Sequence, residues 1–194
     1  MIGRPRATTH WAIRDAAITL FIRDGYAETS LAAVAQECGI SRTTLFAYFP
    51  AKADILLYGD ERNIERVLAL LADAPFDVPA GLALVRAART MRPLPSNARE
   101  ELTVYWHILD ANADVAAKAR LIGRRYGSAI TGFLAQRLGT TPEDGLPALL
   151  GETLPAVLAA AARHWTAHPE LGPSLEDALE QAVVPLVAGY LGSR

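Results

Sequence analysis

The residues with the clearest chemical potential stand at the start of a short helix that the sequence predicts over residues 42–48. Arg42, Thr43 and Thr44 occupy its first turn, where a guanidinium and two hydroxyls can hydrogen-bond to base edges and phosphates. A helix N-terminus also offers free backbone N–H groups and a partial positive charge. The pattern therefore predicts a surface that binds a nucleic acid.

A second short helix, residues 31–37, precedes this one. Gly39 lies between them and allows a sharp turn, because it adopts backbone angles that residues with a Cβ resist. Two short helices joined in this way form the helix-turn-helix pattern, here over residues 30–49, and its second helix enters the major groove. The apolar residues spaced to pack the two helices together are Val34, Ile40 and Leu45.

Start and stop signals position these helices. Thr9, Ser30 and Ser41 each precede a helical pattern and are candidate N-caps. Gly25 is expected to end the first helix in the left-handed conformation, and Pro50 ends the third. The residues before Pro50 therefore form a head of three helices.

The remaining chain also has helical periodicity, and no segment alternates as a strand would. We expect an all-α fold of about nine helices, with a DNA-binding head over residues 1–52 and a larger helical body over residues 53–194. Asn112 is the expected N-cap of one body helix. The helices expected beyond the head span residues 51–72, 80–91, 97–110, 113–138, 143–168 and 174–192.

Charge is distributed unevenly along the chain. The net charge is −2, but residues 1–52 carry six Lys and Arg against four Asp and Glu, whereas the remainder carries 13 against 17. Since phosphate binding depends on where charge lies, this asymmetry favours a basic head on an acidic body. With 51% hydrophobic residues the chain can bury a core.

Several classes of protein are not expected. Cys38 is the single cysteine and cannot form an internal disulfide, no apolar run approaches the ~18 residues that span a bilayer, and no signal peptide begins the chain. We therefore expect a cytoplasmic protein without a membrane partner. No nucleophile elbow, P-loop or dinucleotide-binding motif is present, so we expect neither an enzyme nor a cofactor.

A metal site is not expected either. His164 and His168 stand four residues apart, which suits a metal, but no third ligand has matching spacing. A histidine near a helix C-terminus is favoured by the helix dipole in any case.

Two segments resemble the DNA-binding domain of TetR-type transcriptional regulators, namely residues 16–26 and 29–56, which contain the ending Phe-Pro-x-Lys at 49–52. The segment around Trp165 and the tail after it are similar to actinobacterial members. The resemblance implies a ligand-responsive repressor that binds a palindromic double-stranded DNA operator as a homodimer. It also implies release by a small, largely apolar effector, for which an acyl chain is one candidate.

Carried over by position, the first turn of the helix at 42–48 would contact base edges or nearby phosphates. The hydroxyl of Tyr48 would bind a phosphate, although a packed aromatic side chain is the alternative. Lys52 would hold a backbone phosphate, although a solvated lysine is the alternative. Thr9, and either Ser30 or Thr29, would add phosphate contacts at helix N-termini.

The chain departs from the family pattern within this motif. Phe46 and Ala47 replace a common Tyr-His pair, so Phe46 would touch a thymine methyl instead of donating to a phosphate. Thr43 replaces a small residue. Arg4 and Arg6 would reach the adjacent minor groove as an arm, the alternative being an unstructured terminus. Thr43, Phe46 and Ala47 are where the operator preference of this chain is expected to differ.

The resemblance further implies a four-helix dimer interface, with residues 143–192 of each chain contributing two helices. The alternative is that their apolar stripes complete the core of one chain. The first stripe is Leu149, Leu154, Val157, Leu158, Ala161 and Trp165; the second is Leu175, Leu179, Val183, Val184, Leu186, Val187 and Tyr190.

The middle helices would, by the same resemblance, enclose the effector pocket. Pockets combine apolar walls with a few polar groups, although aromatic residues at helical spacing are more often core. The main rival hypotheses are a DNA-binding regulator with no small-molecule effector and a helical enzyme or carrier with a vestigial head. The candidate pocket residues are Met91, Leu102, Tyr105, Trp106, Leu109, Ile122 and Tyr126.

Overall fold

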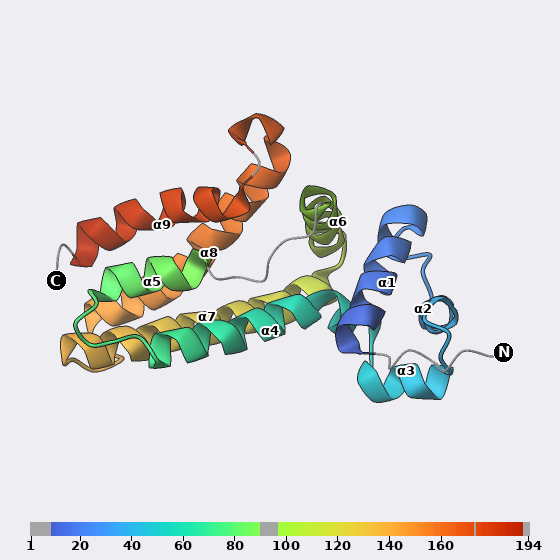
Figure 1. Cartoon of the computed structure of the whole chain (residues 1–194), viewed down its shortest axis with the longest axis horizontal. Helices are drawn as coiled ribbons and strands as arrows, with labels where there is room; N and C mark the ends of the chain where they lie inside the picture. The colour runs from blue at the N-terminus through green and yellow to red at the C-terminus, as the bar shows by residue number, and fades with distance from the viewer. Residues whose placement is uncertain (1–8, 90–96, 173, 192–194) are drawn as a thin grey trace.

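The protein is all-helical, as predicted (Figure 1). The computed structural model describes residues 9–89, 97–172 and 174–191, and within these ranges it contains no strand. The helices are α1 (His10–Asp24), α2 (Leu31–Glu37), α3 (Arg42–Tyr48), α4 (Lys52–Ala72), α5 (Ala80–Arg89), α6 (Ala98–Ala111), α7 (Ala113–Leu138), α8 (Gly145–Ala167) and α9 (Leu175–Leu191), with a 3-10 turn at Pro169–Leu171.

The three helices of the head begin where the sequence predicted. The side chains of Thr9, Ser30 and Ser41 accept hydrogen bonds from backbone N–H groups three residues on, at 3.0–3.1 Å. These bonds satisfy amides that lack a partner within the helix. Capping therefore fixes the start of α3, the helix with the candidate DNA contacts.

Glycines make both turns of the head. Gly39, between α2 and α3, has φ 64°, which favours glycine. Gly25 ends α1 with φ 93° and ψ 150°, so its φ is positive but it lies outside the left-handed helical region that we expected. The Gly25 N–H still donates to the carbonyl of Phe21. The extended ψ directs the chain away from α1 into the loop before α2.

The body surrounds a pair of long helices. In Figure 1, α4 and α7 lie side by side along the body, α5 and α8 pack beside them, α9 packs on α5 and α8, and α6 stands between the body and the head. The predicted N-cap Asn112 makes no capping bond, because its amide donates to the Ile108 carbonyl of the preceding helix. The buried apolar residues form one cluster around the head and its junction with the body, a second within the body, and a small third around Trp165.

Helix α8 is long and apolar. It is 23 residues long and is the one helix of the described residues that is apolar enough to cross a membrane by length and composition. Our expectation that no segment approaches that length was wrong here, because Glu152 breaks the apolar run without making the helix polar. Only 22% of the apolar window is buried within the chain.

Helices α7 and α8 touch through their backbones. A Cβ added to Gly127 would lie 2.6 Å from the Gly151 carbonyl oxygen, and one added to Gly151 would lie 2.7 Å from that of Gly127. Real Cβ atoms do not approach oxygen so closely, so only glycine fits at either position. This crossing fixes the two helices on which α9 and α4 pack.

We predict that Gly151→Ala lowers the free energy of unfolding by about 1–3 kcal/mol, because the helices must separate to admit a methyl group. Gly132→Ala is the control, since Gly132 also lies inside a helix, α7, but has no atom within 4 Å of an added Cβ. That control should stabilise the protein by about 0.5–1 kcal/mol through helix propensity. Equal urea midpoints for the two variants would contradict this account of the crossing.

Candidate nucleic-acid interface

The helix α3 is exposed over most of its surface. Leu45 is its one buried residue, and Phe49 directly after it is also buried. Arg42, Thr43 and Thr44 are exposed, and Phe46 keeps 45% of its surface. The side chains predicted to read bases therefore lie on the solvent side of a helix that is held from behind.

The positive charge of the head is less available than the sequence count implied. Arg14 pairs with Glu101 of α6, and Arg23 pairs with its neighbour Asp24. Arg42 has no ion pair or hydrogen bond to any residue that the structure describes. Its guanidinium is thus the basic group of α3 that remains available to an anion.

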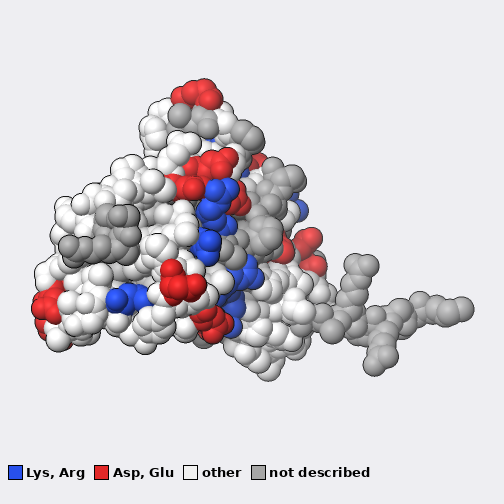
Figure 2. Space-filling model, turned by 60° about the vertical axis from the view of Figure 1, so that its left-hand side comes forward, with Lys and Arg blue, Asp and Glu red and all other residues white. Residues whose placement is uncertain are grey.

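Several basic side chains of the body lie beside acids. Figure 2 shows Lys and Arg gathered in a band across the middle of one face, with Asp and Glu beside them. Arg62 pairs with Glu65, and Arg89 pairs with Glu180. Because acids flank these bases, their charge is partly neutralised within the protein.

Lys52 folds back onto the loop between α1 and α2. Its ammonium donates to the carbonyl oxygens of Tyr26, Ala27 (3.4 Å) and Thr29 (2.8 Å) and lies 4.2 Å from the centroid of the Tyr26 ring. Burial lowers the pKa of Lys52, and the nearby charge of Glu28 opposes this effect. All three N–H donors of the ammonium therefore have partners within the head.

The two candidate residues at the start of α2 differ. Ser30 is exposed, whereas Thr29 is 3% exposed. The Thr29 hydroxyl donates to the Gly25 carbonyl at 2.7 Å, and its backbone N–H donates to the same residue. Ser30 is therefore the one of the pair that faces solvent. Thr9 is also exposed, whereas Arg4 and Arg6 lie outside the described residues.

An aromatic cluster supports the end of α3, and sequence reasoning missed it. The ring of His10, the first residue of α1, lies 4.7 Å from that of Tyr48 and 5.2 Å from those of Phe49 and Tyr58. Half-buried Tyr48 is thus held in place on one side by His10. No periodicity links residue 10 to residue 48, so only the fold brings them together.

A polar group lies where the head meets the body. The Tyr105 hydroxyl of α6 donates to a carboxylate oxygen of Asp60 at 2.8 Å, and the Tyr126 hydroxyl of α7 donates to the Asp60 backbone carbonyl at 3.1 Å. Burial raises the pKa of Asp60 to about 6, although the Tyr105 hydrogen bond and the Arg14 charge oppose it. Burial also raises the pKa of both tyrosines.

The candidate pocket residues are dispersed in the structure. Tyr105, Leu109, Ile122 and Tyr126 pack in the core cluster around the head and junction, whereas Leu102 packs near Trp165. Trp106 contacts the Tyr105 ring and the Arg163 guanidinium. Met91 lies outside the described residues.

A small cavity lies farther into the body, with a volume of about 30 Å³. Tyr126 is the one candidate pocket residue that lines it, and it reaches the cavity from α7. The other lining residues are apolar and come from α4, α5, α7, α8 and α9: Val67, Leu84, Ala87, Ala88, Ile130, Leu154, Leu158 and Val183.

The apolar stripes of α8 and α9 contain both buried and exposed residues. Six of their residues are buried within the chain and complete its core, as the alternative hypothesis held. Three large apolar side chains remain exposed, Leu149 and Val184 at 41% and Tyr190 at 52%. The buried six are Leu154, Trp165, Leu175, Leu179, Val183 and Val187.

An exposed, capped second helix that is packed from behind by two others defines a helix-turn-helix DNA-binding regulator. Two family profiles match the chain, one described as bacterial regulatory proteins of the tetR family, over residues 13–58, and one described as the MftR C-terminal domain, over residues 78–191. The chain belongs to the TetR family of transcriptional regulators. It is therefore a regulator and not an enzyme.

Individual relatives agree with this assignment. The chain is 26% identical over 189 residues to the protein described as the mycofactocin biosynthesis transcriptional regulator MftR of Mycobacterium tuberculosis, covering 97% of this chain and 94% of that one. Thermus thermophilus FadR, a TetR-family repressor solved with lauroyl-CoA, is 26% identical with a TM-score of 0.61, covering 94% and 95%. SmeT, the repressor of a Stenotrophomonas maltophilia efflux pump, has a TM-score of 0.63 at 18% identity, covering 94% and 90%, and shows the fold alone.

The raised pKa of Asp60 predicts a pH dependence of stability. The Asp60 carboxyl binds its proton more tightly in the folded state than in the unfolded state, where its pKa is 3.8. The contribution of Asp60 to stability therefore falls as pH rises from about 4 to about 6 and is constant above that range. Asp60→Asn should remove this slope, which amounts to at most ~3 kcal/mol for two pKa units, and should be at least as stable as wild type at pH 7.

Asp110→Asn is the matched control for that measurement. Asp110 is exposed, and its hydrogen bond with Arg163 lowers its pKa, so its contribution is lost as pH falls. Its removal should therefore not reduce the loss of stability between pH 4 and 6. Chemical denaturation across that range gives the comparison, and an unchanged slope in Asp60→Asn would contradict the assignment.

Proposed function

We propose that the chain is a homodimeric repressor that binds a palindromic operator through α3 and is released by a small, largely apolar effector. The observation that carries the DNA-binding part is the exposure of α3, which buries Leu45 alone and presents an arginine and two threonines. A second copy is required because one such motif reads few base pairs, and two must lie about 34–36 Å apart to reach successive major grooves. A regulator of this kind works in the cytoplasm.

The proposed contacts follow the exposure of the side chains. Arg42, Thr43 and Thr44 contact base edges, with Phe46 against a thymine methyl. Phosphate contacts are assigned to the hydroxyls at the helix N-termini and at the end of α3, and to one lysine. These phosphate-binding residues are Thr9, Ser30, Tyr48 and Lys52, with Arg4 and Arg6 as a minor-groove arm.

Lys52 has a specific requirement within this proposal. Its ammonium has three carbonyl partners in the free protein, so a phosphate must replace one of them. If it does, Lys52→Met lowers the slope of log affinity against log salt by about one. An unchanged slope would assign Lys52 to the support of the loop alone.

The dimer is proposed to form through α8 and α9. Helix α8 exposes an apolar surface that includes Leu149, and α9 exposes Val184 and Tyr190. Exposed apolar surface on these two helices is best covered by a second copy, since symmetric dimers are the commonest assembly. Four helices, two from each chain, would then form the interface.

The effector is proposed to enter the small cavity in the body. Every lining residue except Tyr126 is aliphatic, which favours an apolar ligand such as an acyl chain. The Thermus FadR relative was solved with lauroyl-CoA, which supports the same class. Ligand pockets usually hold 300–1,000 Å³, so an effector must widen this cavity by separating α4 and α5 from α7. That movement would shift α4 and the head.

The DNA-binding part is tested by two substitutions in α3. Thr44→Ala should change base preference at one operator position and cost about 1–3 kcal/mol there, whereas Tyr48→Phe should weaken all sequences alike. Operators selected from random DNA by the wild-type protein supply the sites, and gel shifts with base-substituted operators measure both effects. Thr103→Ala is the control, since Thr103 lies on α6 and its hydroxyl donates to the Arg99 carbonyl.

Wild-type affinity and preference in both variants would refute this docking of α3. A Tyr48→Phe variant that altered base preference instead would move Tyr48 from the phosphates to the bases.

The effector part is tested by narrowing the cavity. If lauroyl-CoA or the free fatty acid releases the operator, Ala87→Leu should raise the concentration required by about tenfold, because the larger side chain occupies the cavity. Ala117→Leu, at an exposed position of α7, should leave that concentration unchanged. Release that no compound in a broad screen achieves would favour a regulator without a small-molecule effector.

A further inference from the structure

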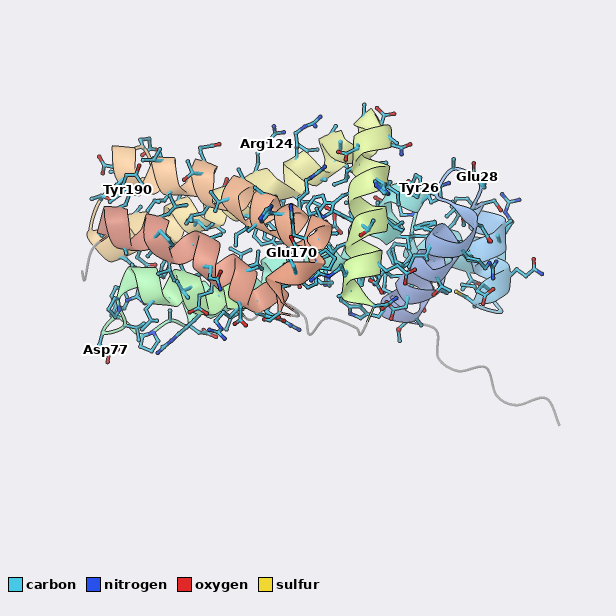
Figure 3. All side chains as sticks on the ribbon, turned by 90° about the horizontal axis from the view of Figure 1, so that it is seen from above. Tyr26, Glu28, Asp77, Arg124, Glu170 and Tyr190 are labelled. Atoms are coloured by element: carbon cyan, nitrogen blue, oxygen red, sulfur yellow. The ribbon has the colours of Figure 1, made fainter. Side chains whose placement is uncertain are left out.

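The head meets the body at several places. The chain itself continues from α3 into α4, and the apolar core of the head includes Ile108 of α6 and Val115 and Ile122 of α7. Helix α1 also forms an ion pair with α6, between Arg14 and Glu101, with 2.8 Å between Nη1 and Oε2. Figure 3 shows α6 lying across the long helices, between the body and the helices of the head. Apolar contacts are not directional, whereas an ion pair fixes the relative position of two particular groups.

The ion pair is largely enclosed, so each charge depends on its partner. Both side chains are only 14% exposed, and Arg14 also contacts the exposed carboxylate of Asp15 at 3.1 Å. The Nε of Arg14 is buried and has no hydrogen-bond partner in the described structure. A buried charge that loses its counterion is strongly destabilising, so the position of Arg14 depends on Glu101.

Helix α6 is firmly attached to the body. Its Arg99 donates to the backbone carbonyls of Trp165 and Gly172, at the end of α8 and beyond it. Tyr105, one turn after Glu101, donates to Asp60 of α4. Glu101 therefore moves with the body and not with the head.

Helix α1 connects the contact with α6 to α3. His10 lies one turn before Arg14 on α1, and its ring packs on Tyr48 and Phe49 at the end of α3. Residues four apart share one face of a helix. A single turn of α1 thus separates the contact with the body from the contact with α3.

We propose that Arg14 and Glu101 are positioning residues that fix the orientation of the head on the body, so that α6 as well as α4 determines where α3 lies. The consequence for DNA affinity rests on the proposed function, but the orientation itself does not. A ligand that displaced α6 would then reorient the head even if α4 remained in place.

The orientation is measured in DNA-free protein by the distance between two spin labels. Labels at Gln36 of α2 and Gln136 of α7, both exposed, report head against body in a Cys38→Ala background. Labelled chains are diluted with unlabelled chains so that only distances within one chain contribute. Glu101→Gln should broaden or shift the distance distribution, and Asp110→Asn, which removes an exposed ion pair between α6 and α8, should not.

The double variant Arg14→Met/Glu101→Gln separates positioning from stability. It leaves neither member of the ion pair without its partner, although Asp60 also loses the nearby Arg14 charge, so its unfolding midpoint should recover toward wild type while its distance distribution stays altered. A distribution that recovers together with stability would show that the pair has a merely structural role and would overturn the proposal. An unaltered distribution in Glu101→Gln would overturn it equally.

A DNA measurement on the same variants distinguishes this inference from the proposed function. If the proposed function and this inference both hold, the double variant binds the selected operator about tenfold more weakly than wild type. Free energy must then be spent to orient the two heads at the spacing of the operator. If wild type selects no operator, the proposed function fails, while the distance distributions still decide the role of the ion pair.

Discussion

Helix α3 must stay exposed to reach DNA and yet hold a fixed position, although an exposed helix gains little stability from burial. The rest of the structure depends on how α3 is held in place. Seven residues are too few for a helix that is stable in water by itself. Leu45 is the only fully buried residue of α3, so α3 gains little from burial of its own surface. Its stability comes instead from the Ser41 cap at one end and from Phe49 and the aromatic cluster at the other.

The elements around α3 hold it in place. Lys52 closes the loop before α2 by binding three of its carbonyls, and so fixes the start of α4 relative to α1. The head shares its core with α6 and α7, since Ile108, Val115 and Ile122 belong to the same cluster as Leu45. The head is therefore not an independent unit hung on a linker. Its contacts with the body include this shared core and the Arg14–Glu101 ion pair.

The sequence predicted the local features and missed the long-range ones. Helix bounds came out within a few residues because Ser and Thr caps, glycines and prolines act on their own neighbours. The exposed face of α3 followed equally from the spacing around Leu45. By contrast, nothing in the spacing placed Lys52 on the Tyr26 loop or His10 beside Tyr48, because those contacts join separate helices. Periodicity also identifies an apolar stripe without saying what covers it, so Leu179 and Val184 of one stripe have different surroundings.

The cavity illustrates the same limit. Tyr105 and Leu109 combine the residue types that line pockets, yet they pack in the junction core, while the cavity is lined mainly by Leu and Ala. Residue type does not reveal a cavity, because a void depends on how five helices fit together. Tyr126 contacts both core clusters and was identified only because it is aromatic and near the middle of α7.

The central claim is that the exposed face of α3 reads DNA. The most direct measurement is a salt titration of binding between the full chain and the DNA immediately upstream of its own gene, with a scrambled duplex of equal length for comparison. We expect sequence-selective binding whose log affinity falls linearly with log salt concentration, and an affinity about 10³-fold or more above that for the scrambled duplex. Footprinting of the bound duplex should show a two-fold symmetric protected site. Equal affinity for both duplexes, or no binding at low salt, would contradict it.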